Sequence, residues 1–205
     1  MADRRLVARP ALTGFDRADR IGKATGPAGV AVVLRGDLRI ASVIARRGAL
    51  PELSARAEKI FGLALRSGPY RVARERHTIL GIGPGRWMFV QEGGAREFAA
   101  ELERDFAGVA SVSDHSDGYA VFEVSGVCAR KALAKGVAID IHPNSFGTGD
   151  VAVTAVAHIG AILWQTNNLP CYGMAVFRSY AGSFWHWLSG SAIEFGIEQA
   201  PLRRA

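Results

Sequence analysis

Segments with the apolar spacing of strands alternate along this sequence with segments that have the spacing of helices. In the first half, Pro51 and Gly62 bracket a predicted helix, because proline suits a first helical turn and glycine a helix end. The elements predicted for this half are strand residues 30–44 with a break at Gly36-Asp37, a helix at 51–62, strands at 78–83 and 86–91, and a helix at 94–108.

The second half offers the same order of elements without evident sequence identity to the first. They are a strand at 118–124, a short helix at 125–136 with Ser125 as its N-cap, one long or broken strand at 151–165, a strand at 172–178 and a helix at 179–195. We therefore predict an α+β protein built from two strand-helix-strand-strand-helix units, with helices packed on mixed or antiparallel sheets. The predicted divisions are a basic N-terminal arm (1–26), a first α+β unit (27–110), a second α+β unit (111–197) and a C-terminal tail (198–205).

The last predicted helix carries two of the four tryptophans around a histidine. On a helical wheel its large apolar side chains fall in one arc, with Trp185 at the edge, and this pattern indicates a face that packs on the core. His186 points away from that arc, beside small residues, so we predict that it is exposed and consider a subunit contact as the second possibility. The residues in the arc are Tyr180, Phe184, Trp187, Leu188, Ala192 and Phe195.

Positive charge is concentrated near the N-terminus. Residues 1–76 carry 16 Lys and Arg against 7 Asp and Glu, whereas residues 77–205 carry 9 against 12. Such an asymmetry suggests a docking surface for nucleic acid or for an acidic protein, but a solvated basic face that maintains solubility is the interpretation we favour. The basic stretch lacks the interleaved aromatic residues of a single-strand binder and matches no nucleic-acid motif, so we expect no nucleic acid as partner.

Motifs of catalysis and metal binding are weak throughout. The Pro84-Gly85 pair lies between two apolar runs and predicts a hairpin turn, because neither a phosphate loop nor a dinucleotide loop continues directly into a strand. The five histidines have no ligand spacing, and no nucleophile elbow is present. Asp114 and Asp117 are either paired carboxylates or, as we favour, parts of a turn before a strand. We therefore predict no catalytic, cofactor-binding or metal-binding residue on this chain.

The compartment is predicted from the cysteines and from hydropathy. Cys128 and Cys171 form neither a metal spacing nor a disulfide framework, which is typical of reduced thiols in a cytoplasmic protein. No apolar run approaches the roughly 18 to 20 residues of a membrane helix, and the basic N-terminus is not followed by an apolar stretch. We expect no membrane association and no secretory signal.

Several short motifs, in this order along residues 30 to 190, resemble the gamma subunit of heterotetrameric sarcosine oxidase. The hairpin with Pro84, Gly85 and Trp87 resembles a hairpin of that family. The remaining motifs are Asp114-x-Ser116-Asp117-Gly118, Ser125-Gly126 leading into Ala129-Arg130, Leu133-Ala134-Lys135-Gly136, Asp140-Ile141-His142-Pro143, and Arg178-Ser179-Tyr180-Ala181 ahead of Trp185-x-Trp187-Leu188. Their order makes the resemblance more specific than any single motif.

That family is similar in fold to the folate-binding aminomethyltransferase of the glycine cleavage system, so the resemblance implies this fold. Asp117 stands where the transferase pattern has histidine. The transferase also carries acidic residues just after a glycine in the strand that corresponds to residues 157–165. Here Gly160 is followed by Ala-Ile-Leu-Trp at 161–164, so no carboxylate is present to hold a charged amine or act as a base. The resemblance implies a relative of a folate enzyme without its reacting group.

The resemblance also implies an accessory, non-catalytic role within an enzyme complex. Such a complex oxidatively demethylates sarcosine to glycine, transfers the one-carbon unit to tetrahydrofolate and forms hydrogen peroxide. FAD, FMN, NAD, tetrahydrofolate and zinc would be bound by other subunits, and the partners of this chain would be the alpha, beta and delta subunits. Arg4, Arg5 and Arg9 of the arm, together with His186, are the candidate interface residues. The alternative is a free-standing folate-binding protein similar to the aminomethyltransferase.

Overall fold

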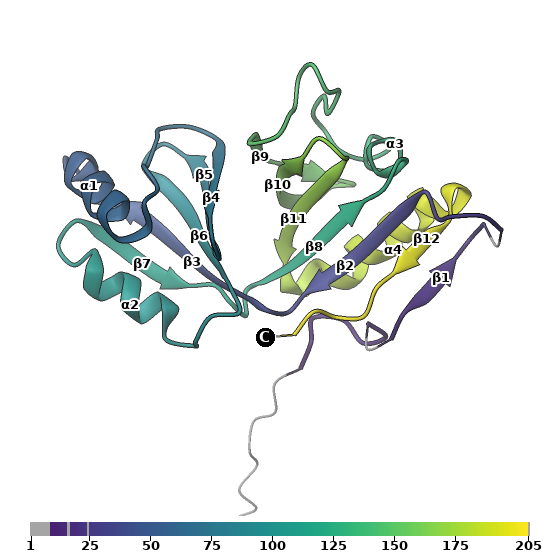
Figure 1. Ribbon diagram of the computed structural model, residues 1–205, viewed down its shortest axis with the longest axis horizontal. Helices are drawn as coiled ribbons and strands as arrows, with labels where there is room; N and C mark the ends of the chain where they lie inside the picture. The colour runs from purple at the N-terminus through teal and green to yellow at the C-terminus, as the bar shows by residue number, and fades with distance from the viewer. Residues whose placement is uncertain (1–8, 16, 24, 205) are drawn as a thin grey trace, which may run out of the picture.

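The strands form two sheets, and helices cover the outer side of each sheet, so the predicted α+β class is confirmed (Figure 1). The computed structural model describes residues 9–15, 17–23 and 25–204. The predicted hairpin at Pro84-Gly85 is confirmed, since β5 ends at Gly83 and β6 begins at Arg86.

The larger sheet has seven strands and is mixed. Its neighbours are antiparallel except β12 and β2, which pair in parallel. β12 lies between β1 and β2, so a strand from near the C-terminus separates two strands from near the N-terminus (Figure 1). The order across the sheet is β1 (Asp19–Ile21), β12 (Ile197–Gln199), β2 (Val30–Arg35), β8 (Tyr119–Ser125), β11 (Cys171–Phe177), β10 (Ile159–Asn167) and β9 (Val151–Val156).

The smaller sheet has five strands, all antiparallel to their neighbours. Its two edge strands, β4 and β7, were not predicted from the sequence. β4 reads Tyr-Arg-Val-Ala-Arg and β7 reads Ala-Ser-Val-Ser-Asp, and both are too polar and too exposed to show a clear apolar period. The order is β4 (Tyr70–Arg74), β5 (His77–Gly83), β6 (Arg86–Glu92), β3 (Leu38–Ala45) and β7 (Ala110–Asp114).

In the part of the chain that the structure describes, four α-helices pack on the outer faces of the sheets. The predicted ends of the first helix are confirmed: Pro51 lies in its first turn, and Gly62 ends it at a left-handed φ of 64°. α1 and α2 pack on the five-stranded sheet, and α3 and α4 pack on the seven-stranded sheet. The bounds are α1 (Leu50–Phe61), α2 (Phe98–Asp105), α3 (Ala129–Leu133) and α4 (Ala181–Ala192), with 3-10 turns η1 (Arg178–Tyr180) and η2 (Ile193–Phe195) on either side of α4.

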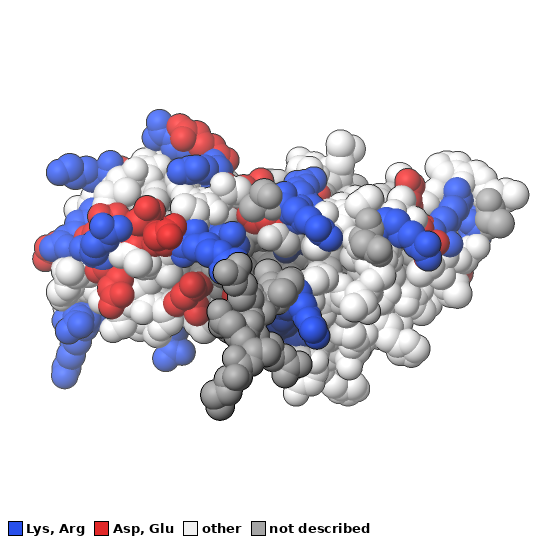
Figure 2. Space-filling view, turned by 90° about the horizontal axis from the view of Figure 1, so that it is seen from below, with Lys and Arg blue, Asp and Glu red and all other residues white. Residues whose placement is uncertain are grey.

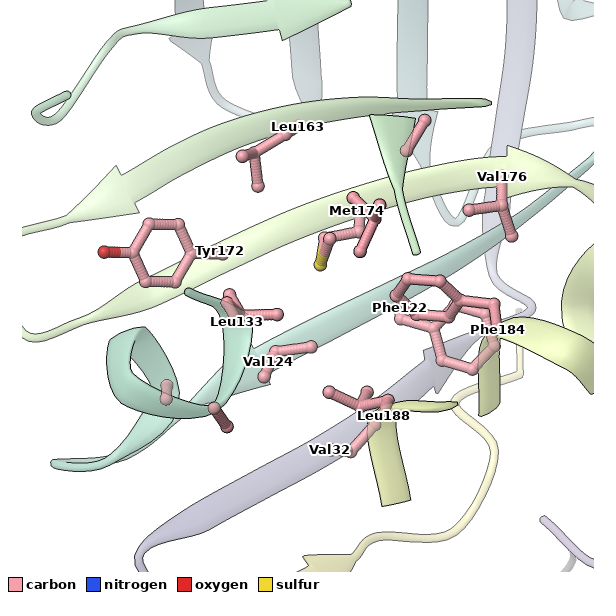
Figure 3. Packing of buried hydrophobic residues seen from close by; sticks show 14 of the residues in the cluster. Val32, Phe122, Val124, Leu133, Leu163, Tyr172, Met174, Val176, Phe184 and Leu188 are labelled. Atoms are coloured by element: carbon pink, nitrogen blue, oxygen red, sulfur yellow. The ribbon is translucent and has the colours of Figure 1, made fainter. Parts of the chain in front are cut away.

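The helix α4 buries the face that the helical wheel predicted. Phe184 and Leu188 are fully buried and point toward the strands that carry Val32, Phe122 and Val124 (Figure 3). Tyr180 is an exception, because it belongs to η1 rather than to α4 and is 51% exposed. A 3-10 turn has about three residues per turn, so the rotation of 100° per residue does not apply to it.

Two local predictions were wrong in detail. Ser125 is the last residue of β8, and α3 starts only at Ala129, after Cys128, so Ser125 is not its N-cap. The segment 151–165, predicted as one long or broken strand, is interrupted after Val156 and forms most of a hairpin of β9 and β10. The hairpin turns at Ala157 and His158, which have φ of 47° and 69°. Consecutive residues with positive φ are typical of a tight two-residue hairpin loop.

The inner faces of the two sheets pack against each other. A third apolar cluster contains Leu80, Met88 and Val90 from the five-stranded sheet and Ile162 and Trp164 from β10 of the seven-stranded sheet. The sheets are therefore two middle layers between two outer layers of helices. The chain joins them by two short connections, one from β2 to β3 and one from β7 to β8.

Sheet membership does not follow the division that the sequence suggested at residue 110. β2 comes from the first predicted unit but pairs with β8 and β12, while β7 comes largely from the second unit but pairs with β3. The arm (1–26) contributes β1, and the boundary at 197 falls on the first residue of β12. The division of the chain into an arm, units at 27–110 and 111–197 and a tail at 198–205 stays a prediction.

Candidate functional site

The connection from β2 to β3 carries a buried ionic cluster. Arg35, the last residue of β2, binds both carboxylate oxygens of Asp37 with Nε–Oδ1 and Nη2–Oδ2 distances of 2.8 and 2.9 Å. It also contacts Glu123 of β8 at 3.2 Å and Glu92 of β6 at 3.1 Å. The side chains of Arg35 and Asp37 are only 7% and 8% exposed. One guanidinium thus links carboxylates from both sheets.

The ionic cluster keeps Arg35 charged despite its burial. Burial alone lowers the pKa of the guanidinium, but the hydrogen bond to Asp37 and the negative charges of Asp37, Glu92 and Glu123 outweigh it, so the pKa lies above its ordinary value. A group held so firmly in its charged form has no use as an acid or a base near neutral pH. The cluster therefore serves to hold the sheets together.

A cavity of about 270 Å³ lies beside this cluster, between the sheets. Arg71 and Cys171 line it, together with Glu92 and Glu123. The Nε of Arg71 is buried and has no hydrogen-bond partner among the described residues. Burial lowers the pKa of Arg71 and raises the pKa of the Cys171 thiol, so the thiol stays protonated and unreactive.

The side chains of β10 that pack between the two sheets are apolar. Ile162 and Trp164 face the other sheet, and Ala161 and Leu163 face the helices. The indole of Trp164 lies over Gly173 of β11, its partner across the strands, so closely that a Cβ on Gly173 would come within 2.0 Å of the ring. No carboxylate is present at 161–164, and large apolar side chains occupy the inner positions.

A larger cavity of about 600 Å³ lies near the connection between the sheets and is rich in arginine. Asp114 and Asp117 are its acidic residues. Asp114 accepts hydrogen bonds from the backbone N–H and the hydroxyl of Ser116, at 2.8 and 2.7 Å, so the turn predicted here is present. The arginines that line the cavity are Arg9, Arg35, Arg39, Arg96, Arg178 and Arg204.

The candidate interface residues from the sequence fall in different places. Arg4 and Arg5 lie outside the described residues. Arg9 is exposed at the larger cavity, where its carbonyl oxygen accepts a hydrogen bond from Arg178. His186 is exposed on α4, where it lines neither cavity. The structure therefore brings Arg9, but not His186, to the arginine-rich cavity.

Sequence reasoning missed the other arginines of the larger cavity. Arg39 belongs to β3, Arg96 precedes α2, Arg178 starts η1, and Arg204 lies near the C-terminus. Because these arginines are far apart along the chain, no local sequence motif indicated that they form a cluster. The excess of positive charge in residues 1–76 was the one sequence feature that indicated the cluster, and it covers only Arg9, Arg35 and Arg39.

The described residues form neither a cluster of metal ligands nor a membrane-spanning helix. Within residues 9–15, 17–23 and 25–204, no three His, Cys, Asp or Glu side chains gather as metal ligands would. No helix in the same part of the chain has the length and hydropathy to cross a membrane.

The fold defines a class of protein: a chain with the fold of the glycine cleavage system aminomethyltransferase. The structure superposes on glycine cleavage system aminomethyltransferase T from Bartonella henselae with a TM-score of 0.63 and 16% identity, covering 91% of this chain and 49% of that one. It superposes on a chain of the heterotetrameric sarcosine oxidase from Corynebacterium sp. U-96 with a TM-score of 0.73 and 22% identity, covering 83% and 87%.

Sequence comparison narrows this class to one family. Residues 46–194 match the family "Sarcosine oxidase, gamma subunit". The chain is 31% identical to sarcosine oxidase subunit gamma of Corynebacterium sp. (strain P-1) over 67% of each chain. It is also 31% identical to that of an Arthrobacter species, over 65% of this chain and 66% of the relative. The chain belongs to the sarcosine oxidase gamma subunit family, and the resemblance found in the sequence is confirmed.

Proposed function

We propose that this chain is the gamma subunit of a heterotetrameric sarcosine oxidase, an accessory subunit that does not itself catalyse the reaction. The match of residues 46–194 to the gamma family carries the proposal. The inner side of β10 supports the non-catalytic part. Ile162 and Trp164 pack there against the five-stranded sheet. The transferase pattern has carboxylates in the corresponding part of this strand. Without an ionisable group, this strand supplies no base and no counter-charge for an amine.

The reaction belongs to the complex as a whole. It is the oxidative demethylation of sarcosine to glycine, with transfer of the one-carbon unit to tetrahydrofolate and formation of hydrogen peroxide. In this proposal the alpha, beta and delta subunits are the partners, and they bind FAD, FMN, NAD, tetrahydrofolate and zinc. The two unpaired thiols, Cys128 and Cys171, support a cytoplasmic location, because structural disulfides are rare there.

Purification of the chain alone and with its partners tests the proposal. The isolated full chain is expected to show no flavin absorbance and no sarcosine turnover. Co-expression with the other subunits is expected to yield a stable complex that contains this chain and oxidises sarcosine. Recovery of a fully assembled, active oxidase from which this chain is missing would contradict the proposal.

The alternative is a free-standing folate-binding protein, and the superposition on the aminomethyltransferase is the observation that favours it. The chain, however, covers only 49% of that protein and has no acid after Gly160. Calorimetry with tetrahydrofolate distinguishes the two functions. We expect no binding in the micromolar range by the isolated chain, and micromolar binding would favour the alternative.

A further inference from the structure

The larger cavity gathers positive charge from parts of the chain that are far apart in sequence. Arg9 comes from the N-terminal segment, Arg39 from β3, Arg96 from the connection before α2, and Arg204 from the C-terminal tail. Figure 2 views the molecule from below, and Lys and Arg side chains lie at several places on this face. The fold itself assembles the cluster, since no short segment contains it.

Among the described residues, carboxylates leave most of that charge uncompensated. Within the described residues, Arg35 is the one arginine of the cavity that forms a salt bridge. The Nε of Arg39 is buried and has no hydrogen-bond partner in that part of the chain. A buried guanidinium N–H without an acceptor costs free energy that an incoming oxygen atom would recover.

The two acids of the cavity do not supply this acceptor. Asp114 is engaged by the backbone and the hydroxyl of Ser116, and neither Asp114 nor Asp117 forms a salt bridge with a described residue. Five arginines besides Arg35 therefore face two carboxylates around the cavity. The net charge attracts an anionic group.

The lining also offers apolar contacts between the charges. Leu38, Ile40, Tyr119 and Val121 line the cavity together with the arginines. Arg96 and Arg204 lie exposed, while Arg39 is more deeply placed. An occupant that suits this surface combines several carboxylates with apolar groups and extends from the exposed arginines to Arg39, as a peptide segment does.

We infer that the larger cavity is a docking site for an acidic segment of another subunit of the oxidase, whose carboxylates pair with Arg39, Arg96 and Arg204. This inference rests on the proposed function, because that function requires a stable contact with other subunits. Paired charges of this kind set the register of an interface and speed its formation, so the contact is sensitive to salt.

Charge reversal at the two exposed arginines tests the inference. The full chain carrying Arg96→Glu and Arg204→Glu is co-expressed with the other subunits, and its affinity for them is measured at low and at high salt. We expect a loss of at least about 10-fold at low salt relative to wild type, because like charges then face each other. The variant with Arg96→Lys and Arg204→Lys is expected to retain most of the affinity.

A matched control places the same charge change elsewhere. Arg47 and Arg86 are exposed and lie near the far ends of β3 and β6 from the connection between the sheets, where they line neither cavity. Arg47→Glu with Arg86→Glu is expected to change the affinity by less than about 2-fold. Circular dichroism of each variant checks that the fold is retained.

The outcomes separate the inference from the function on which it rests. If the Arg96→Glu, Arg204→Glu chain is folded and assembles as tightly as wild type, the docking site is wrong and the proposed function stands. If the wild-type chain joins no complex, the proposed function fails. Citrate is the probe for a small anion: micromolar binding to the full chain, abolished by the same two substitutions, would replace the subunit segment with a small carboxylate ligand.

Discussion

At the scale of single residues, the apolar side chains around Trp164 explain why β10 offers no acid or base. The lack of a carboxylate after Gly160 is visible in the sequence, and so is the large aromatic residue that follows. The position of the indole over Gly173 is not visible there, because it depends on the register between β10 and β11. Residue types were thus predictable, whereas their contacts across strands required the fold.

Substitution of Gly173 by alanine tests this close contact. The added Cβ would lie 2.0 Å from the ring of Trp164, which is 7% exposed and has little room to move. We expect the free energy of unfolding to fall by roughly 1–3 kcal/mol, as in other overpacked cores, measured by urea denaturation. Gly160→Ala in the paired strand β10 is the control. Its Cβ would meet nothing within 4 Å, so an equal loss there would contradict this explanation.

His77 provides a test that depends on pH. Burial, with a smaller contribution from Arg76, lowers the pKa of its ring, and Glu75 opposes this shift. The ring lies beside Phe61 and contacts the amide of Gln91 at 3.0 Å. The folded state thus prefers the neutral imidazole, and protonation favours unfolding.

The stability of the protein is therefore expected to fall as the pH drops below about 6.5, the ordinary pKa of histidine. His77→Gln should show a weaker fall between pH 7.5 and 5.5 in urea denaturation. Titration of the ring by NMR gives the pKa directly, and a value above that of a free histidine would refute the expectation.

At the scale of elements, the sequence revealed the interior of each sheet better than its edges. The central strands β2, β6 and β8 and the helices α1 and α4 were predicted, because their apolar residues repeat with a clear period. The edge strands β4 and β7 were missed, because an edge strand has one neighbour and buries few side chains. The short strand β12 was also missed, since its place depends on pairing with β1 and β2.

Substitutions on the buried and the exposed face of α4 are expected to differ in their effect on stability. Phe184 is fully buried, with its ring centroid 4.8 Å from that of Phe122, whereas His186 is exposed. We expect Phe184→Ala to lower the free energy of unfolding by about 3–5 kcal/mol and His186→Ala to change it by less than about 0.5 kcal/mol. Similar values for the two variants in chemical denaturation would mean that the helix is packed differently.

At the scale of the whole molecule, the two sheets depend on the ionic cluster at their connection. Arg35 belongs to the seven-stranded sheet and Glu92 to the five-stranded sheet, while Asp37 lies in the connection from β2 to β3. Neither this cluster nor the arginine-rich cavity was predictable, since both combine residues that only the folded chain brings together. The charge asymmetry of the sequence was compatible with an acidic partner or with a solvated basic face, and it did not locate the arginine-rich cavity.

Removal of Arg35 is expected to weaken the whole structure. Arg35→Met leaves Asp37, which is 8% exposed, as a buried charge without its partner, and the expected loss is roughly 3–5 kcal/mol in the free energy of unfolding. In the double variant with Asp37→Asn, the loss should be smaller than the sum of the two single losses, because the stranded charge is gone. Additive losses would show that the two side chains are not coupled.

The position of β12 between β1 and β2 has a consequence for how the chain is made. While residues up to 196 leave the ribosome, the edge of β2 that later pairs with Ile197–Gln199 stays open, and β1 has no neighbour to join. Open strand edges promote aggregation, so the nascent chain is vulnerable until residues 197–199 have appeared and paired with β2. Completion of the seven-stranded sheet thus waits for residues 197–199, and chaperones that protect the β2 edge are expected to act until these residues have paired.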